Sequence, residues 1–206
     1  MDRRELIKMI TLLTGGAVVG SEFFLSGCKA GGKAEVGFSA ANIAMLDEVG
    51  ETILPATSSP GAKEAKVGEF MKVYVTDCYT QANQDEFVKG INELDEACKK
   101  MYKKGFMDCD AGQRKVLLIS LENKAKEYNV AQAEKDKTNY EELKIQNKEK
   151  DFVASPRHYY SMMKQLTLLG FFTSEVGAKK ALRHIAVPGR YDGALPYKKG
   201  DKAWAD

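Results

Sequence analysis

One pattern constrains this chain most strongly: apolar residues recur every three or four positions along most of the sequence after residue 38. The clearest case is the segment 85–102, in which six apolar side chains fall on one helical stripe: Phe87, Ile91, Leu94, Cys98, Met101 and Tyr102. Lys103, Lys104 and Gly105 follow, and cations in the last turn with a glycine beyond them are typical of a helix end. No segment alternates with the two-residue period of a strand, so the sequence predicts an all-α fold.

Helices are also expected on both sides of this segment. The apolar spacing predicts one over 40–53, with Ser39 as its N-cap, and another over 67–79. A further helix should begin after Asp110, because Gln113 follows three residues later as in a capping box. We therefore predict a single helical domain over residues 38–184.

The last helices are expected to begin at serines. Ser155 followed by Pro156 is typical of a helix start, with the proline in the first helical position. The helix that follows is apolar on nearly all sides and should lie centrally in the fold; its apolar residues are Tyr159, Tyr160, Met162, Met163, Leu166, Leu168, Leu169, Phe171 and Phe172. Ser174 and Glu175 should start a short helix that ends near His184.

Charge and cysteine content narrow the classes of function. Lys plus Arg number 31 and Asp plus Glu 29, so the net charge of +2 argues against a nucleic-acid binder. From 124 to 151, 14 of 28 residues are charged, with both signs, which predicts a solvated helix and loop. Cys98 and Cys109 could meet across a helix turn as a disulfide, although buried free thiols, Cys78 included, are the favoured interpretation.

The sequence contains no recognisable catalytic or metal-binding motif. The two histidines, His158 and His184, lie 26 residues apart and neither belongs to a ligand-spaced cluster. No nucleophile elbow, dinucleotide-binding or phosphate-binding glycine loop is present, and the three cysteines after residue 28 match no common iron–sulfur spacing. We therefore assign no catalytic, cofactor-binding or metal-binding residue to this chain.

The N-terminus has the layout of an export signal. Arg3 and Arg4 stand in the string RRELIK, and a moderately apolar stretch follows over residues 9–25. That stretch is shorter than the roughly 20 strongly apolar residues of a spanning helix, and small residues close it. Residues 1–27 thus resemble a twin-arginine signal peptide, which predicts export. An ordinary amphipathic helix with an incidental arginine pair is the alternative.

The end of this segment, Leu-Ser-Gly-Cys28, resembles a bacterial lipobox. The thiol of Cys28 would carry the diacylglycerol, and several acyl chains together anchor a protein firmly to a membrane. Small and polar residues follow, so we predict a flexible tether over 28–37 and a lipid-anchored protein on the periplasmic side of the bacterial envelope. A plain cleaved signal with an incidental cysteine is the alternative.

Two further stretches carry a family resemblance when they are taken together. The first is ILPATSSPGAKEAKVGEF at 53–70; the second is FTSEVG at 172–177, followed by VPGRYDG at 187–193. With the leader in front, the chain resembles the gluconate 2-dehydrogenase subunit 3 family over nearly all of its mature length. It departs from better-known members in its lipobox, in Ala194 where some relatives have a cysteine, and in the charged stretch 124–151.

The resemblance implies a function in a complex. Such a subunit has no catalytic residues and no cofactor of its own; a large flavoprotein of the glucose–methanol–choline class carries FAD and oxidises a sugar or polyol. Electrons then pass to a cytochrome c subunit or another acceptor. The small subunit is thought to escort its folded partner through the twin-arginine route. A free-standing lipoprotein that binds a ligand or a protein is the alternative, followed by an enzyme in its own right.

The last segment, 185–206, has aromatic residues but no helical period. Tyrosine and tryptophan bury a large area with few rotors to freeze, and arginine adds a forked set of donors. We therefore predict an extended tail that binds the partner flavoprotein through Pro188, Gly189, Arg190, Tyr191 and Trp204. The alternative is that the tail covers the helices of this same chain.

Overall fold

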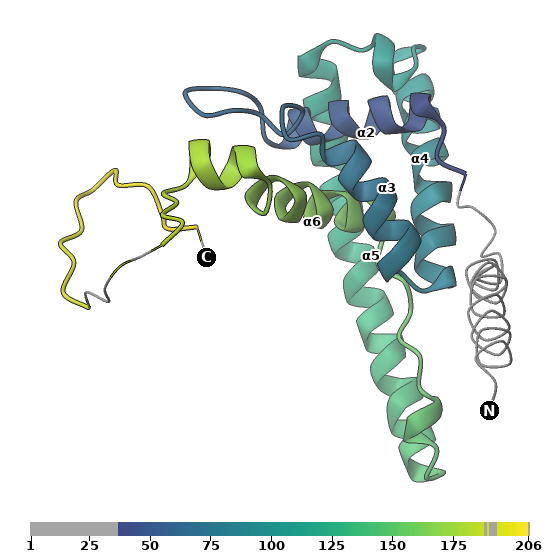
Figure 1. The fold of residues 1–206 in the computed structure, drawn as a ribbon. Helices are drawn as coiled ribbons and strands as arrows, with labels where there is room; N and C mark the ends of the chain where they lie inside the picture. The colour runs from purple at the N-terminus through teal and green to yellow at the C-terminus, as the bar shows by residue number, and fades with distance from the viewer. Residues whose placement is uncertain (1–36, 188, 190–192, 206) are drawn as a thin grey trace, which may run out of the picture. The chain divides into compact units, whose positions relative to one another are not determined.

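The structure is a computed structural model, and it describes residues 37–187, 189 and 193–205 (Figure 1). In this part of the chain the regular elements are helices and no strand forms, which confirms the all-α prediction. The α-helices are α2 (Ala40–Ile53), α3 (Val67–Cys78), α4 (Gln81–Tyr102), α5 (Ala111–Ile145) and α6 (Tyr159–Phe172). Short helical turns are η1 (Phe106–Asp108), η2 (Glu149–Asp151) and η3 (Gly177–Ala181). Arg3, Arg4 and Cys28 lie outside the described residues.

The expected helix starts are confirmed at two places. Ser39 caps α2, its side chain accepting the N–H of Asn42. Asp110 and Gln113 form the expected capping box of α5, each side chain bonding the backbone N–H of the other. Both caps satisfy N–H groups that a helix N-terminus would otherwise leave unpaired.

Helix α4 begins four residues earlier than the apolar spacing predicts, at Gln81. Thr80 caps it, and Gln84 in its first turn is buried although it is polar. The amide of Gln84 donates to the carbonyl oxygens of Val75, Thr76 and Tyr79 at the end of α3, at 2.9–3.1 Å. One side chain therefore satisfies several carbonyls that the end of α3 leaves free, and it joins the two helices.

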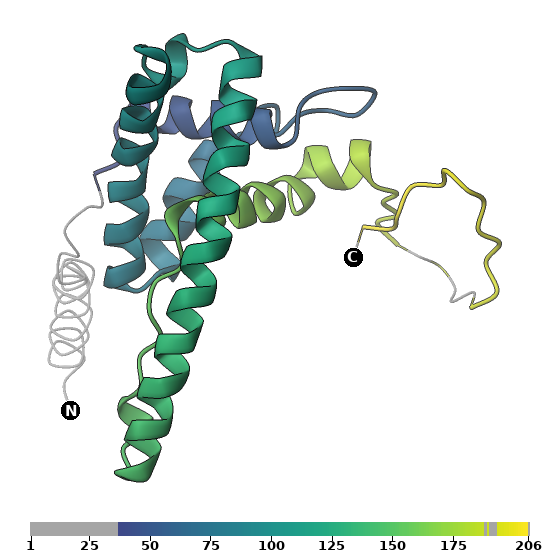
Figure 2. The same cartoon turned by 180° about the vertical axis from the view of Figure 1, so that it is seen from behind.

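Helix α6 lies at the centre of the domain, as its apolar surface predicts. It packs against α2, α3, α4 and α5 (Figures 1 and 2). Its crossing with α4 is close at Gly90, where a Cβ atom would stand 2.2 Å from the Cβ of Tyr159. Twelve large side chains of α6 and of the elements around it are fully buried: Phe87, Phe106, Leu46, Met71, Ile91, Leu94, Leu117, Met163, Leu166, Val49, Val67 and Val75.

The predicted helix start at Ser155 and Pro156 is wrong, because α6 begins at Tyr159 with His158 as its N-cap. Ser155 is engaged elsewhere: its N–H and its hydroxyl donate to the two carboxylate oxygens of Asp136, at 2.9 and 2.7 Å. The N–H of His158 donates to Asn129 at 3.0 Å. Bonds to α5 thus hold the incoming chain extended until it reaches His158.

The charged stretch 124–151 is a solvated helix and loop, as predicted. Helix α5 continues through it to Ile145, and the chain then returns along the second half of α5 toward α6 (Figure 2). Tyr140 and Phe152 meet edge to face at 5.4 Å between ring centres and hold this return segment to the helix.

The cysteines after residue 28 are free thiols, and the favoured burial is confirmed for Cys98 and Cys109 but is wrong for Cys78. Cys98 and Cys109 are buried, with 3.5 Å between their sulfur atoms, and Cys78 is exposed. Burial, with the neighbouring Cys109, raises the pKa of Cys98 to about 12.

No described helix combines the length and the hydrophobicity that crossing a bilayer requires.

Candidate functional site

The first signature stretch forms the loop between α2 and α3 and the first turn of α3, and a glutamate outside the stretch, Glu51, organises the loop. The carboxylate of Glu51 accepts the N–H groups of Ala56 and Lys63, at 2.8 and 3.0 Å. It leaves no room for a side chain at Gly61, where a Cβ atom would stand 2.3 Å from the Glu51 carboxylate. The loop returns to the core through Ala62, which is fully buried. A side chain at Gly61 would therefore displace the Glu51 carboxylate that holds the loop, and one larger than alanine at position 62 would press on the core.

An ion-pair network fixes the base of this loop to α5. Glu48 binds Lys63, and it binds Arg114 at 2.6 Å. The guanidinium of Arg114 also donates to the carbonyl oxygens of Phe106 and Met107. The hydrogen bond from Lys63, together with the charge of Arg114, holds the pKa of Glu48 below its usual value. Sequence reasoning missed Glu48, Glu51 and Arg114. The one signal in the sequence was Glu51, a carboxylate one helical turn before Pro55, the proline that ends α2.

The TSEVG stretch forms the turn that follows α6. The hydroxyl of Ser174 donates to the carbonyl of Phe171 at 2.6 Å and accepts the N–H of Gly177 at 3.0 Å. A Cβ atom on Gly177 would lie 2.0 Å from the same Phe171 carbonyl oxygen, so only glycine fits. The predicted short helix does start here, as one turn with π-helical bonding over Gly177–Ala181.

The two signature stretches lie at the same end of the domain. Lys180, just after the TSEVG turn, pairs with Glu64 in the α2–α3 loop. Gly170 in α6 lies against the ring of Phe70 in α3, where a Cβ atom would be 2.5 Å from the ring. Sequence reasoning could name both stretches but could not show that they are neighbours.

The C-terminal segment leaves from this end and closes into a loop. Arg183 and Trp204 form an isolated parallel bridge: the N–H of Arg183 donates to Ala203 and the N–H of Ala205 to Arg183, both at 2.8 Å. The Arg183 guanidinium lies over the Trp204 ring, 4.7 Å from its centre, and 3.7 Å from Asp201. We call residues 184–203 the C-terminal loop.

The C-terminal loop and Trp204 expose their apolar side chains. The exposed fraction runs from 43% at Trp204 to 81% at Val187, and the set comprises Ile185, Val187, Leu195, Tyr197 and Trp204. None of the described residues of the segment is buried. These residues therefore do not cover the helices of this chain, which was the alternative. Of the predicted partner-binding residues, Gly189 is exposed and Trp204 half-exposed, while Pro188, Arg190 and Tyr191 lie outside the described residues.

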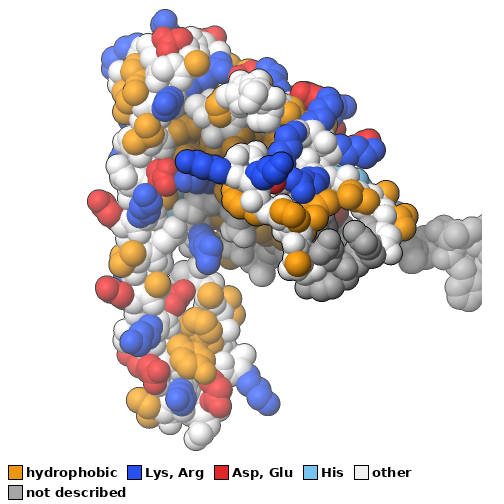
Figure 3. Space-filling model, turned by 90° about the vertical axis from the view of Figure 1, so that its left-hand side faces the viewer, with side chains coloured by type: hydrophobic (Ala, Val, Ile, Leu, Met, Phe, Trp, Pro, Cys, Tyr) orange, Lys and Arg blue, Asp and Glu red, His pale blue; other side chains and the backbone are white. Residues whose placement is uncertain are grey.

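Positive charge gathers beside these apolar side chains. Between residues 172 and 205 the described basic residues are Lys179, Lys180, Arg183, Lys198, Lys199 and Lys202, against the acidic Glu175 and Asp201. Figure 3 views this side of the molecule and shows lysine and arginine side chains grouped next to hydrophobic ones. Such a mixture is suited to a partner surface that is apolar at its centre and acidic around it.

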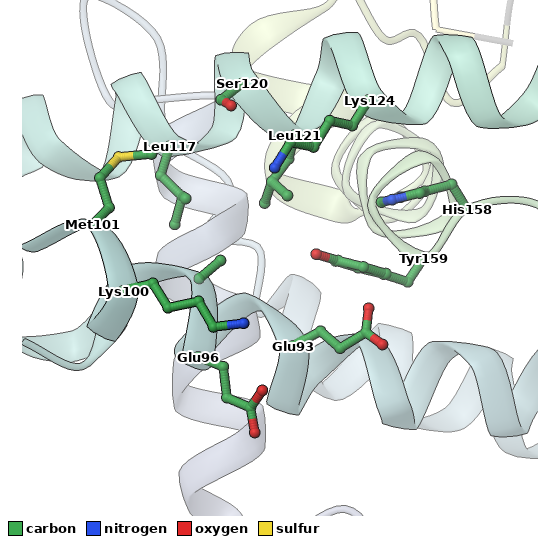
Figure 4. Close-up of a pocket in the computed structure, with 11 residues that line it drawn as sticks. Glu93, Glu96, Lys100, Met101, Leu117, Ser120, Leu121, Lys124, His158 and Tyr159 are labelled. Atoms are coloured by element: carbon green, nitrogen blue, oxygen red, sulfur yellow. The ribbon is translucent and has the colours of Figure 1, made fainter.

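A second hollow lies elsewhere, between α4 and α5 (Figure 4). His158 and Tyr159 close one end of it, with their rings stacked at 4.4 Å. Burial lowers the pKa of His158, so its ring is neutral at pH 7. Across the described residues, no three His, Cys, Asp or Glu side chains gather as metal ligands.

Comparison with known proteins finds one match. The family described as gluconate 2-dehydrogenase subunit 3 matches residues 40–189, a range that includes the first signature stretch and TSEVG and ends within VPGRYDG. Neither the curated proteins nor the solved structures yield a match.

Proposed function

The chain belongs to the gluconate 2-dehydrogenase subunit 3 family, and from this premise we propose that it is the non-catalytic small subunit of an FAD-dependent sugar or polyol dehydrogenase. The family is named for a subunit of an oxidoreductase complex. In the proposal a large flavoprotein of the glucose–methanol–choline class binds FAD and oxidises the substrate. A cytochrome c subunit or another acceptor takes the electrons, and this chain holds and escorts the flavoprotein.

The exposed apolar face of the C-terminal loop carries the proposal. Val187 and Tyr197 are among the most exposed large side chains of the described chain, and Trp204 beside them is fixed by Arg183. Large apolar side chains that a fold holds in place yet leaves in water are typical of an interface with another protein.

The charges around the loop indicate the chemistry of the partner surface. Lys179, Lys180 and Arg183 are paired with Glu175, Glu64 and Asp201, so the excess positive charge comes from Lys198, Lys199 and Lys202. This excess favours an acidic region on the flavoprotein, beside the surface that accepts Trp204 and Tyr197. Pairs at the rim of an interface mainly raise the rate of association and are screened by salt. We expect the complex to assemble more slowly at 0.5 M than at 0.05 M NaCl, with a smaller change in its rate of dissociation.

We propose in addition that Arg3 and Arg4 direct export of the assembled pair and that Cys28 anchors it on the periplasmic side. Two guanidinium groups present planar donors that lysine does not reproduce. Replacing both arginines with lysine should leave this chain and the flavoprotein together in the cytoplasm. Cys28→Ser should release the exported complex from membranes, and normal export of the Lys–Lys variant would contradict the escort role.

Co-purification from the native host tests the proposal. An affinity-tagged chain should bring down one large protein with the absorption of FAD, and the complex should reduce an artificial acceptor when a sugar or polyol is added. The chain purified alone should show no flavin or haem absorption. Recovery of the tagged chain without any flavoprotein, from cells that contain dehydrogenase activity, would contradict it.

A further inference from the structure

The hollow between α4 and α5 has the size and lining of a small-molecule site. Its volume is about 570 Å³, within the range of ligand pockets. Its apolar lining comprises Ala97 and Met101 from α4 with Leu117 and Leu121 from α5. We call this hollow the α4–α5 groove; it is separate from the C-terminal loop, and the proposed function does not use it.

Tyr159 places an unpartnered polar group in this groove. The residue is 97% buried, because its exposed fraction is 3%. Within the described residues its hydroxyl has no hydrogen-bond partner, and Figure 4 shows it pointing into the groove. Because no buried side-chain oxygen or nitrogen of the described residues lacks a partner, this hydroxyl is open to the solvent of the groove, where a ligand can accept its hydrogen bond.

His158 supplies a second donor at the same end. Its Nδ1 accepts the N–H of Tyr160 at 3.2 Å, so the neutral ring carries its proton on Nε2. The ring is held by its stack on Tyr159 and by an edge contact with Tyr128, at 5.5 Å between ring centres. Its orientation is therefore fixed before any ligand arrives.

The charges that line the groove favour an anion. Lys100 and Lys124 form no ion pair with any described residue, and Figure 4 shows both ammonium groups turned toward the space that Tyr159 faces. The carboxylates of the groove are less available: Glu93 is paired with Lys89 at 3.0 Å, and Figure 4 shows Glu96 pointing away. Two lysines thus face one carboxylate, that of Glu93, whose pair with Lys89 is exposed to solvent and whose negative charge still acts on Tyr159.

We propose that the α4–α5 groove binds a small organic carboxylate with an apolar body. The carboxylate lies between Lys100 and Lys124 and accepts the Tyr159 hydroxyl, while the apolar body covers Leu117 and Leu121. Charge-assisted bonds of this kind are roughly twice as strong as neutral ones, and the apolar floor adds burial of the ligand. Ser120 on the rim offers a further hydroxyl to a polar substituent.

Three matched probes test the charge preference: benzoate, benzyl alcohol and benzylamine, each titrated into the isotope-labelled full chain and followed by NMR. Benzoate should shift the signals of Tyr159 and Leu121 with a saturable dependence on concentration. Benzyl alcohol and benzylamine should bind at least about tenfold more weakly, since they lack the charge that the lysines attract. Equal binding of benzylamine, or no saturable binding of benzoate, would overturn the proposal.

Substitutions then locate the site. Tyr159→Phe removes only the hydroxyl and keeps the buried ring, and it should weaken benzoate binding about fivefold or more. Lys124→Ala should do the same, whereas Lys115→Ala, an exposed lysine on the same helix, should change nothing. Unchanged binding in both groove variants would overturn the site. So would a flavoprotein complex that weakens in these variants while benzoate does not bind, because the groove would then receive an acidic side chain of the protein partner.

Discussion

The helical domain and the C-terminal loop, although parts of one chain, are stabilised in different ways. In the domain, α6 is enclosed by four helices and rings such as that of Phe87 are fully buried. In the loop, Tyr197 is 77% exposed, and a bridge between Arg183 and Trp204 closes the base. The domain owes its stability to its own core, whereas the loop has apolar surface left over for another molecule.

Aromatic substitutions test the difference between the helical domain and the C-terminal loop with the largest expected effect. Phe87→Ala should lower the free energy of unfolding by about 3–5 kcal/mol, because it leaves a cavity in a fully buried site. Tyr197→Ala should change it by less than about 0.5 kcal/mol, since the ring is already in water. Urea unfolding followed by circular dichroism measures both. Similar losses for the two variants would mean that the loop belongs to the core.

A pair of arginines gives the next largest effect. Arg114→Ala should cost about 2–3 kcal/mol, because it leaves Glu48 with only the exposed Lys63 as a partner and removes donors to two carbonyls. Arg183→Ala should cost less than about 1 kcal/mol, since its ion pair with Asp201 is long and partly exposed. The same unfolding curves measure the difference, and a larger loss at Arg183 would reverse the comparison.

The two histidines sharpen the comparison through pH. Burial lowers the pKa of His158 in the folded chain; nearby Glu93 opposes this shift and Lys124 adds to it. Below the unfolded pKa of about 6.5 the unfolded chain therefore binds more protons, and stability falls as pH falls. The free energy of unfolding is measured between pH 7 and 5.5. His158→Asn should make its loss with falling pH less steep, and asparagine is itself a good N-cap residue for α6. His184→Asn, at an exposed position of the C-terminal loop, is the matched control for the substitution, and an unchanged slope in His158→Asn would contradict the account.

Sequence reasoning was most successful where a local signal determines local structure. Helix α2 agrees residue for residue, because Ser39 caps it and Pro55 stops it. The predictions failed where a distant residue intervenes. Gln84 interrupts the apolar pattern of α4 because its amide serves the end of α3, and Asp136 of α5 holds Ser155 out of the helix that it was expected to start.

The candidate site was predictable in part for the same reason. The signature stretches and Trp204 stand out in the sequence, but the bridge from Trp204 to Arg183 joins residues that no local pattern connects. Whether the tail covers its own helices depends on burial, which the sequence does not contain. The α4–α5 groove could not be foreseen either, because Lys100 and Lys124 resemble any other solvated charges until the helices are placed.

Truncation after Ala186 tests the central claim most directly. Wild-type and shortened chains would carry the same C-terminal affinity tag, and both the free energy of unfolding and the flavin recovered per tagged chain would be measured. Leu195→Asp combined with Tyr197→Asp serves as a full-length companion that alters only the exposed face. We expect the shortened chain to unfold within about 1 kcal/mol of wild type, because no described residue of the loop is buried. We also expect both variants to lose the flavoprotein. A shortened chain that recovers as much flavin as wild type, or one that no longer folds, would contradict the account.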